Sequence, residues 1–156
     1  MFHRERVNSI KDSRVVEARE LASASGRRKL GKLLLYGLEQ LEWARTANLI
    51  VEHVFVLESV TDLPPWLESV PLLLVSDGVS KKITDTNYTT AVVGVAREPS
   101  LENRQAGRLV LVLDDVRDAG NVGTLVRTAR AFGIREVWGT VRGFDPFHRK
   151  TIDSSR

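Results

Sequence analysis

The sequence predicts an α/β protein built from two units, in which strands alternate with helices. Short apolar runs alternate with segments of helical periodicity from about residue 30 to residue 96, and the alternation resumes at residue 109. The residues between them show no apolar periodicity and include proline, serine, asparagine and glycine, a composition typical of a linker. We therefore expect a first unit at 1–96, a linker at 97–108 and a second unit at 109–156.

The overall composition excludes several classes of protein. The 156 residues are 42% hydrophobic and 28% charged, as in an ordered globular protein. No run approaches the roughly 20 apolar residues that cross a bilayer, and the amino terminus is polar, so we expect a cytoplasmic protein without membrane contact. The absence of cysteine excludes disulfides and thiolate chemistry, and three scattered histidines lack the spacing of a metal cluster. A metal is therefore not expected.

The charge balance favours nucleic acid as a partner. The net charge is +3, from 23 lysines and arginines against 20 acidic residues. Most of these cations are arginines, whose forked guanidinium suits phosphate. A net charge of this size is also common in proteins that bind no polyanion, so the charge alone leaves the partner open.

The first unit begins with a helical pattern over residues 9–24, which Gly26 and a basic turn are expected to end. The elements predicted next are, in order, a strand at 32–37, a helix at 38–47, a strand at 51–58, a proline turn or first helical turn at 62–70, a strand at 71–77, a short helix at 78–85 and a strand at 89–97. Such an order places helices on the faces of a sheet.

The second unit is predicted to contain a strand at 109–115, a helix at 122–132 and a strand at 135–141. About 50 residues are too few for a complete doubly wound domain, which usually needs about 100 or more. We therefore expect this unit to be truncated and to expose apolar strand edges.

The strand-to-helix junction of the second unit carries the most informative motif. The strand ends in Asp114 and Asp115, which places both at the carboxyl edge of a sheet, where open α/β folds bind ligands. Gly120 and Gly123 allow close backbone approach, and Asn121 is a suitable N-cap for the helix. The glycines match neither a dinucleotide-binding nor a Walker A pattern.

The helix that follows leaves its arginines available. Its apolar residues fall on one face, so Arg127 and Arg130 project away from the buried stripe. Each of these residues also has a purely structural explanation. Asn121 could serve only as a cap, Arg127 could be a solvated arginine, and helix-start electrostatics could account for the two aspartates as well as a metal or phosphoacceptor role does.

The stretch LVLDDVRDAGNVGTLVRTARAFGIREVW, residues 111–138, resembles the first signature motif of the SpoU family of RNA 2′-O-ribose methyltransferases, part of the SPOUT superfamily. Residues 7–44 and 81–99 are similar to parts of that family's amino-terminal substrate-binding domain, a ribosomal-protein-like α/β/α unit. Residues 143–156 resemble a later part of its catalytic domain. The resemblance implies a substrate-binding domain followed by the first part of an α/β knot methyltransferase domain.

The resemblance places Asn121 and Arg127 at the active site and implies S-adenosylmethionine as the methyl donor. In the family the arginine is assigned to activating the ribose 2′-hydroxyl. Guanidinium is a poor general base, since its pKa exceeds about 12. We therefore expect Arg127 to hold a flanking phosphate and stabilise the developing alkoxide, and Asn121 to position the arginine or the ribose.

The resemblance also sets limits on this chain. The family's cofactor pocket and trefoil knot would lie beyond Arg156, so we expect residues 1–156 alone neither to bind S-adenosylmethionine tightly nor to turn over. The family works as homodimers, a state left open for this chain. One departure affects the substrate path, because Asp153 stands where an arginine is common.

Structured RNA is the partner that the resemblance implies, ribosomal RNA more than transfer RNA. The candidate RNA contacts are Arg27, Arg28 and Lys29 in the expected basic turn, together with Arg130 and Lys150. Contacts to phosphates should weaken steeply with salt. A merely solvated basic turn is the plain alternative.

Two other functions compete with a methyltransferase. One is a non-catalytic RNA-binding protein, in which the first unit does the work and the methyltransferase part is vestigial. The other is a receiver-like or Rossmann nucleotide domain built on Asp114 and Asp115, which should need a longer sheet and a different glycine pattern.

Overall fold

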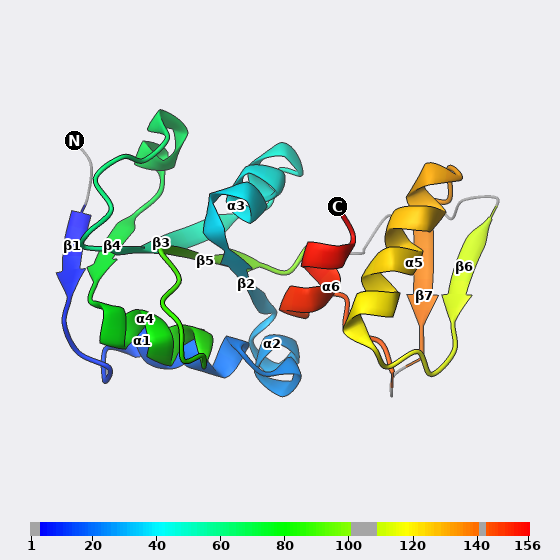
Figure 1. Cartoon of the computed structure of the whole chain (residues 1–156), viewed down its shortest axis with the longest axis horizontal. Helices are drawn as coiled ribbons and strands as arrows, with labels where there is room; N and C mark the ends of the chain where they lie inside the picture. The colour runs from blue at the N-terminus through cyan, green and yellow to red at the C-terminus, as the bar shows by residue number, and fades with distance from the viewer. Residues whose placement is uncertain (1–3, 101–108, 141–142) are drawn as a thin grey trace. The chain divides into compact units, whose positions relative to one another are not determined.

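The computed structural model describes residues 4–100, 109–140 and 143–156, and divides the chain into two compact units (Figure 1). The amino-terminal unit is Met1–Pro99 and the carboxyl-terminal unit is Ser100–Arg156. Most of the predicted linker, residues 101–108, lies outside the described residues. In the described ranges no helix has the length and apolar character needed to cross a membrane.

The amino-terminal unit is built on a five-stranded sheet in the order β1-β4-β3-β5-β2. Its strands are β1 Arg4–Val7, β2 Lys32–Tyr36, β3 Val51–Leu57, β4 Leu72–Val75 and β5 Val92–Arg97. The first three strands in the order are parallel, while β5 runs antiparallel to both β3 and β2. The sheet is therefore mixed.

Helices cover both faces of this sheet. Helices α1 Ser13–Leu21, α2 Ala24–Leu30 and α4 Asp77–Thr84 lie on one side, and α3 Gly37–Thr46 lies on the other (Figure 1). The prolines after β3 lead into a short 3₁₀ helix, Pro65–Ser69. The α/β class and the alternation of elements predicted from residue 30 onwards are thus confirmed.

A continuous apolar core lies between the sheet and the α1–α4 layer. Helix α1 buries Val15, Ala18 and Leu21, each with 0% of its surface exposed, at the three-residue spacing that keeps side chains on one helical face. Leu34 and Phe55 meet them from the sheet. Burying a side chain of this size stabilises the fold by about 1.5–3 kcal/mol.

The basic turn predicted after residue 24 is wrong, because a second helix starts there at once. Helix α2 is capped by Ser23, whose hydroxyl accepts a hydrogen bond from the Gly26 backbone N–H at 3.0 Å. Gly26 sits so close to the Glu20 carbonyl that a Cβ atom would overlap it. The glycine thus allows two helices to join tightly, rather than ending one.

Strand β1 was not predicted. Its residues Arg4, Glu5 and Arg6 are charged and exposed, and only Val7 is buried, so no alternating apolar signal marks it. The strand lies at the edge of the sheet, where charged side chains discourage pairing with another chain. The strand forms because it pairs in parallel with β4.

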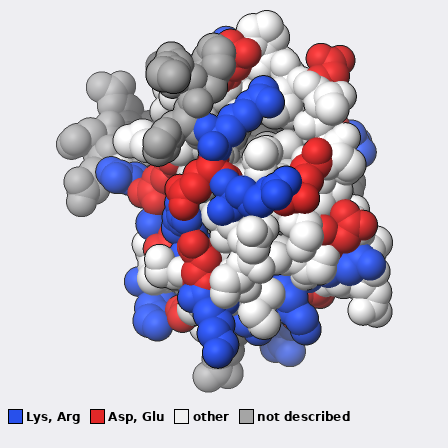
Figure 2. Space-filling view, turned by 90° about the vertical axis from the view of Figure 1, so that its left-hand side faces the viewer, with Lys and Arg blue, Asp and Glu red and all other residues white. Residues whose placement is uncertain are grey.

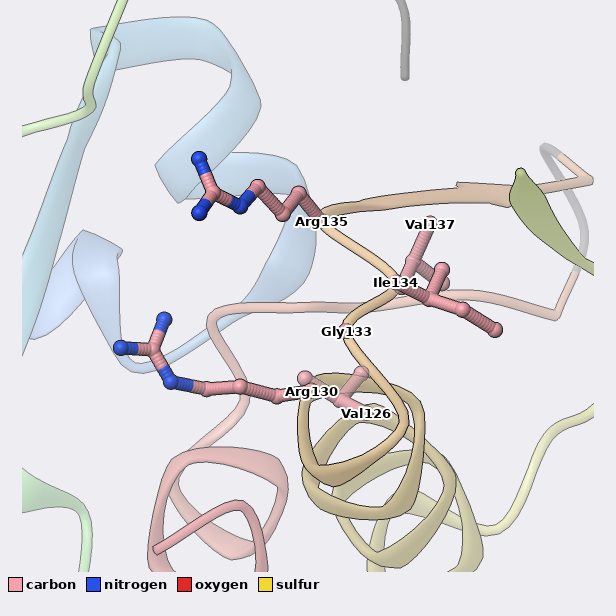
Figure 3. Close-up of a pocket in the computed structure, with 6 residues that line it drawn as sticks. All are labelled: Val126, Arg130, Gly133, Ile134, Arg135 and Val137. Atoms are coloured by element: carbon pink, nitrogen blue, oxygen red, sulfur yellow. The ribbon is translucent and has the colours of Figure 1, made fainter. Parts of the chain in front are cut away.

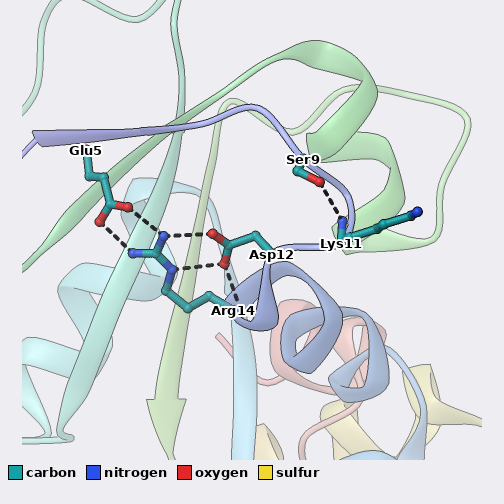
Figure 4. Close-up of polar contacts among 5 residues, drawn as sticks. All are labelled: Glu5, Ser9, Lys11, Asp12 and Arg14. Carbon is teal, nitrogen blue, oxygen red and sulfur yellow. Dashed lines mark hydrogen bonds and ion pairs between the residues drawn. The ribbon is translucent and has the colours of Figure 1, made fainter.

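A charge cluster ties β1 to the start of α1 (Figure 4). The guanidinium of Arg14 donates to both carboxylate oxygens of Glu5, at 2.7 and 2.8 Å, and to those of Asp12, at 3.0 and 2.8 Å. Asp12 also caps α1 by accepting from the Arg14 backbone N–H at 2.9 Å. These bonds to Arg14 lower the pKa of Asp12 from 3.8 to about 2.

We expect Asp12→Asn to destabilise the protein at pH 7 by about 1 kcal/mol, because asparagine keeps the cap but loses the charge. A depressed carboxyl pKa stabilises the fold above the unfolded value of 3.8, and this contribution disappears as the pH falls towards 2. The free energies of unfolding in urea of the wild type and the Asp12→Asn variant should therefore differ at pH 7 and become equal near pH 2. An equal difference at both pH values would contradict this.

The carboxyl-terminal unit contains a parallel strand pair joined by a helix. Its elements are β6 Val110–Leu113, α5 Ala119–Ala131, β7 Glu136–Gly139 and α6 Arg149–Ser154. One face of the pair carries Val112 beside Trp138, which are 59% and 54% exposed, whereas Leu113 on the opposite face is buried. This unit thus exposes apolar side chains on one face of its strand pair, whereas the prediction concerned the strand edges.

Candidate functional site

The candidate site begins at the carboxyl ends of β6 and β7. Asp115, with a positive φ of 51°, follows β6, and its backbone N–H donates to the Thr140 hydroxyl after β7 at 2.8 Å. Its carboxylate accepts from Arg117 Nε and Nη2, at 2.9 and 2.8 Å. Asp115 thus serves to shape the loop between β6 and α5, held from both sides.

The N-cap of α5 is Asp118, so the prediction of Asn121 as the cap is wrong. The helix begins at Ala119, three residues before the predicted start, and Asp118 Oδ1 accepts from the Asn121 backbone N–H at 2.8 Å. This places Asn121 in the first turn with its side chain exposed. Within the described residues the Asn121 amide makes no hydrogen bond, so it is available to a ligand.

Lys150 lies against this helix start. Its Nζ forms an ion pair with Asp118 Oδ2 at 3.3 Å, and both side chains are more than half exposed. The Asn121 backbone N–H, followed by Lys150, holds the pKa of the Asp118 carboxyl below its usual value. A Cβ atom on Gly120 would come within 3.0 Å of Lys150 Cε, so the glycine gives the lysine room.

Gly123 lets α6 pack closely across α5. A Cβ atom there would overlap the Thr151 carbonyl and lie 2.6 Å from Ser154 Cβ. Both predicted close-approach glycines are therefore confirmed as such, although they admit α6 and its lysine rather than a ligand. The packing also brings the Arg156 carbonyl within 3.4 Å of Arg127 Nη1.

Arg127 projects from α5 into solvent, as predicted. The helix buries Val122, Gly123 and Ala129 on another side, so the arginine side chain is free to move. The buried stripe is narrower than predicted, because Leu125 is 36% and Phe132 is 81% exposed. Arg127 and Asn121 share one helix, but no hydrogen bond joins them in the described residues, so a direct contact between the two is not observed.

The basic cluster of α2 separates into one buried and two exposed cations. Arg27 is only 6% exposed, and its Nη1 donates to the carbonyls of Leu21 and Ala22, at 2.7 and 3.1 Å. Its guanidinium thus binds the carbonyl groups at the carboxyl end of α1. The prediction of Arg27 as an RNA contact is therefore wrong. Arg28 and Lys29 remain exposed, with Lys29 bridging to Glu20 at 3.2 Å.

Arg130 lies at the carboxyl end of α5 and lines a hollow together with Arg135 (Figure 3). Arg135 was not among the predicted site residues. Arg135 lies in the short connection between α5 and β7. Helical periodicity does not extend to this connection, so the sequence does not predict that Arg135 and Arg130 line the same hollow. The structure thus adds one cation to the predicted set.

Comparisons with known proteins relate the segment that contains the site to a family. Residues 108–156 match the SpoU rRNA Methylase family. Over 151 residues the chain is 29% identical to the 23S rRNA (guanosine(2553)-2′-O)-methyltransferase RlmP of Bacillus subtilis, covering 96% of this chain and 60% of that protein. It is 31% identical to an uncharacterized tRNA/rRNA methyltransferase of Synechocystis, covering 96% and 57%.

Solved structures show the same fold. A crystal structure of an RNA 2′-O ribose methyltransferase aligns with a TM-score of 0.71 at 27% identity, covering 96% of this chain and 60% of that one. An AdoMet-bound rRNA methyltransferase from Sinorhizobium meliloti aligns with a TM-score of 0.75 at 24% identity, covering 97% and 60%. The chain therefore spans about 60% of the length of these relatives.

Proposed function

We propose, because residues 108–156 match the SpoU rRNA Methylase family, that the chain supplies the RNA-binding side of an S-adenosylmethionine-dependent RNA 2′-O-ribose methyltransferase. The observation that carries this proposal is the placement of Asn121 and Arg127. Both side chains are exposed on α5, which starts at the carboxyl edge of a parallel strand pair, and both lie in the matched segment. Ribosomal RNA is the proposed substrate class, with transfer RNA second.

In this proposal Arg127 binds a phosphate beside the target nucleotide and stabilises negative charge on the ribose 2′-oxygen. Its one hydrogen bond in the described residues, to the Arg156 carbonyl, is long at 3.4 Å. A hydrogen bond to phosphate is shorter and adds the attraction of an opposite charge, so the arginine gains by exchanging the carbonyl for a phosphate. Since its pKa exceeds about 12, the guanidinium does not take the 2′-hydroxyl proton.

Asn121 is proposed to orient the ribose. Its amide offers two donors and an acceptor, which match a sugar hydroxyl that can both give and accept a hydrogen bond. Its backbone N–H is already bonded to Asp118 Oδ1 at 2.8 Å, so the side-chain amide is the group that Asn121 offers to a ligand. The substrate-side roles are therefore assigned to two residues on one rigid helix.

The residues described in the carboxyl-terminal unit do not fit S-adenosylmethionine. Two guanidiniums stand at the hollow beside α5, where they would repel the cofactor's sulfonium charge. We therefore assign no chemical step through the cofactor to these residues, and we propose that residues 1–156 alone bind it only weakly. Isothermal titration that gave micromolar affinity for this polypeptide would contradict that proposal.

The two units are proposed to have different functions, RNA binding and catalysis. Residues 1–96 would bind the RNA substrate as a ribosomal-protein-like domain, 97–108 would link the units, and 109–156 would form part of the catalytic domain. Arg28 and Lys29 are exposed at the end of α2, where backbone phosphates can reach them. Homodimer formation, which the family resemblance implies, belongs to the same proposal and can be measured by sedimentation.

Deleting the gene that encodes this chain tests the function directly. We expect one or more 2′-O-methyl groups to disappear from ribosomal RNA, and to return when the gene is restored on a plasmid. Mapping ribose methylation across ribosomal and transfer RNA gives the readout and distinguishes the two substrate classes. An unchanged methylation map, despite retention of RNA binding by the purified chain, would instead favour a non-catalytic RNA-binding protein.

A further inference from the structure

The hollow at the carboxyl end of α5 presents two cations without counter-charges. It is lined by Val126, Arg130, Gly133, Ile134, Arg135 and Val137, and none of these six carries a negative charge (Figure 3). Figure 3 shows the two arginine side chains extending in the same direction from either side of the turn at Gly133. The hollow therefore combines two cationic side chains with four uncharged residues.

Neither arginine is engaged within the described residues. Arg130 and Arg135 form no ion pair and donate no hydrogen bond there, whereas Arg14, Arg97 and Arg117 are each held by carboxylates at 2.7–2.8 Å. Two like charges that share a hollow repel each other, which costs free energy unless an anion joins them. The pair is therefore suited to an external anion.

The carbonyl groups at the carboxyl end of α5 do not accept hydrogen bonds from these two arginines either. Backbone N–H groups of Phe132, Gly133 and Ile134 donate to the last carbonyls of α5, those of Thr128, Ala129 and Arg130, at 2.9–3.1 Å. The positive φ of 77° at Gly133 makes this closure possible. With the carbonyls already bonded, the guanidiniums keep their donors for a ligand.

The position of the hollow relates it to Arg127. Arg127 and Arg130 are three residues apart on α5, so they occupy adjacent turns on neighbouring parts of the helix surface. Arg135 continues the series past the helix end. Three exposed guanidiniums thus follow one another, starting at the residue proposed to act on the ribose.

We propose that Arg130 and Arg135 form a clamp for an RNA backbone phosphate, next to the nucleotide held at Arg127. This inference rests on the proposed function and adds a residue, Arg135, and a direction for the RNA strand along α5. Two planar forks can surround the two free oxygens of one phosphodiester, a geometry that lysine cannot reproduce.

The test is the affinity of the 156-residue chain for a fluorescein-labelled RNA stem-loop, measured by anisotropy at several salt concentrations. We expect Arg130→Ala and Arg135→Ala each to weaken binding about tenfold, the equivalent of about 1.4 kcal/mol for a lost charge-assisted contact. The slope of log K against log salt should fall by about 1 for each variant. Arg135→Lys should recover the slope but only part of the affinity.

Arg45→Ala is the matched control, because it removes the same charge from an exposed arginine that is already paired with Glu42. We expect its RNA affinity to stay within twofold of the wild type. If the wild type binds RNA and the double variant Arg130→Ala/Arg135→Ala binds equally well, the clamp is overturned while the proposed function stands.

Two further outcomes separate the remaining possibilities. If the wild-type chain shows no salt-dependent RNA binding at all, the RNA-binding part of the proposed function fails, not the clamp alone. If polyglutamate displaces the RNA at equal charge concentration, and the double variant loses polyglutamate binding too, the hollow accepts acidic peptides and the clamp proposal is wrong. Amide NMR spectra of each variant confirm that the fold is retained.

Discussion

Replacing Arg127 by alanine is expected to abolish detectable ribose methylation in the complemented deletion strain. The variant loses the cation that would stabilise the developing 2′-oxyanion, and removing one such donor costs about 10²–10³-fold in rate. Stability should change little, because Arg127 is exposed and, among the described residues, makes only one long hydrogen bond, to the Arg156 carbonyl. The measurement is the occupancy of the methylated ribose that the wild-type gene restores.

Thr128→Ala provides the control for this experiment. Thr128 is the next residue on α5, is exposed, and its hydroxyl bonds only to the Thr124 carbonyl of its own helix at 2.8 Å. Alanine is a better helix former, so α5 should be preserved and methylation should remain at the wild-type level. Full methylation by the Arg127→Ala gene would remove Arg127 from the proposed site.

Replacing Gly26 by alanine is expected to destabilise the amino-terminal unit by about 3 kcal/mol, the upper range for overpacking a closed site. The new Cβ would overlap the Glu20 carbonyl, which is backbone and cannot rotate away. The chain would have to separate α1 from α2, and this movement disrupts the Ser23 cap and the Arg27 bonds to α1. Urea unfolding followed by far-ultraviolet circular dichroism measures the loss.

Gly78→Ala is the matched control, because it adds the same methyl group to another helical glycine. Gly78 is exposed in α4, and its nearest neighbour for a new Cβ would be Ser76 Oγ at 4.0 Å. Alanine should stabilise the helix here by about 0.5–1 kcal/mol, since it lowers the entropy of the unfolded chain. A Gly26→Ala protein as stable as this control would contradict the close helix junction.

The elements that the sequence identified correctly share a strong apolar pattern, either a run or a helical period. Strands β3 and β5 are nearly continuous apolar runs, and α5 follows a period of 3.6 residues around Arg127. The predictions were wrong where an element consists of charged residues or where a single residue was taken as the end of a helix. Strand β1 forms from charged residues through pairing with β4, and the Gly26 region looks like a turn because glycine is usually a helix stop.

The candidate site divides in the same way. The exposure of Arg127 follows from which positions of α5 are apolar, so sequence periodicity is sufficient to predict it. The cap at Asp118, the internal bonds of Arg27 and the pairing of Lys150 with Asp118 depend on residues far from one another or on exact backbone geometry. None of these has a periodic signature.

By itself, the sequence determined the α/β class, the two-unit pattern, the family resemblance and the two residues proposed to act on the ribose. Each of these depends on residue type and on spacing along the chain. Only the tertiary structure decided which cations are available, because burial and pairing are properties of neighbours in space. It enclosed Arg27, paired Lys150 and brought Arg135 to the hollow beside Arg130.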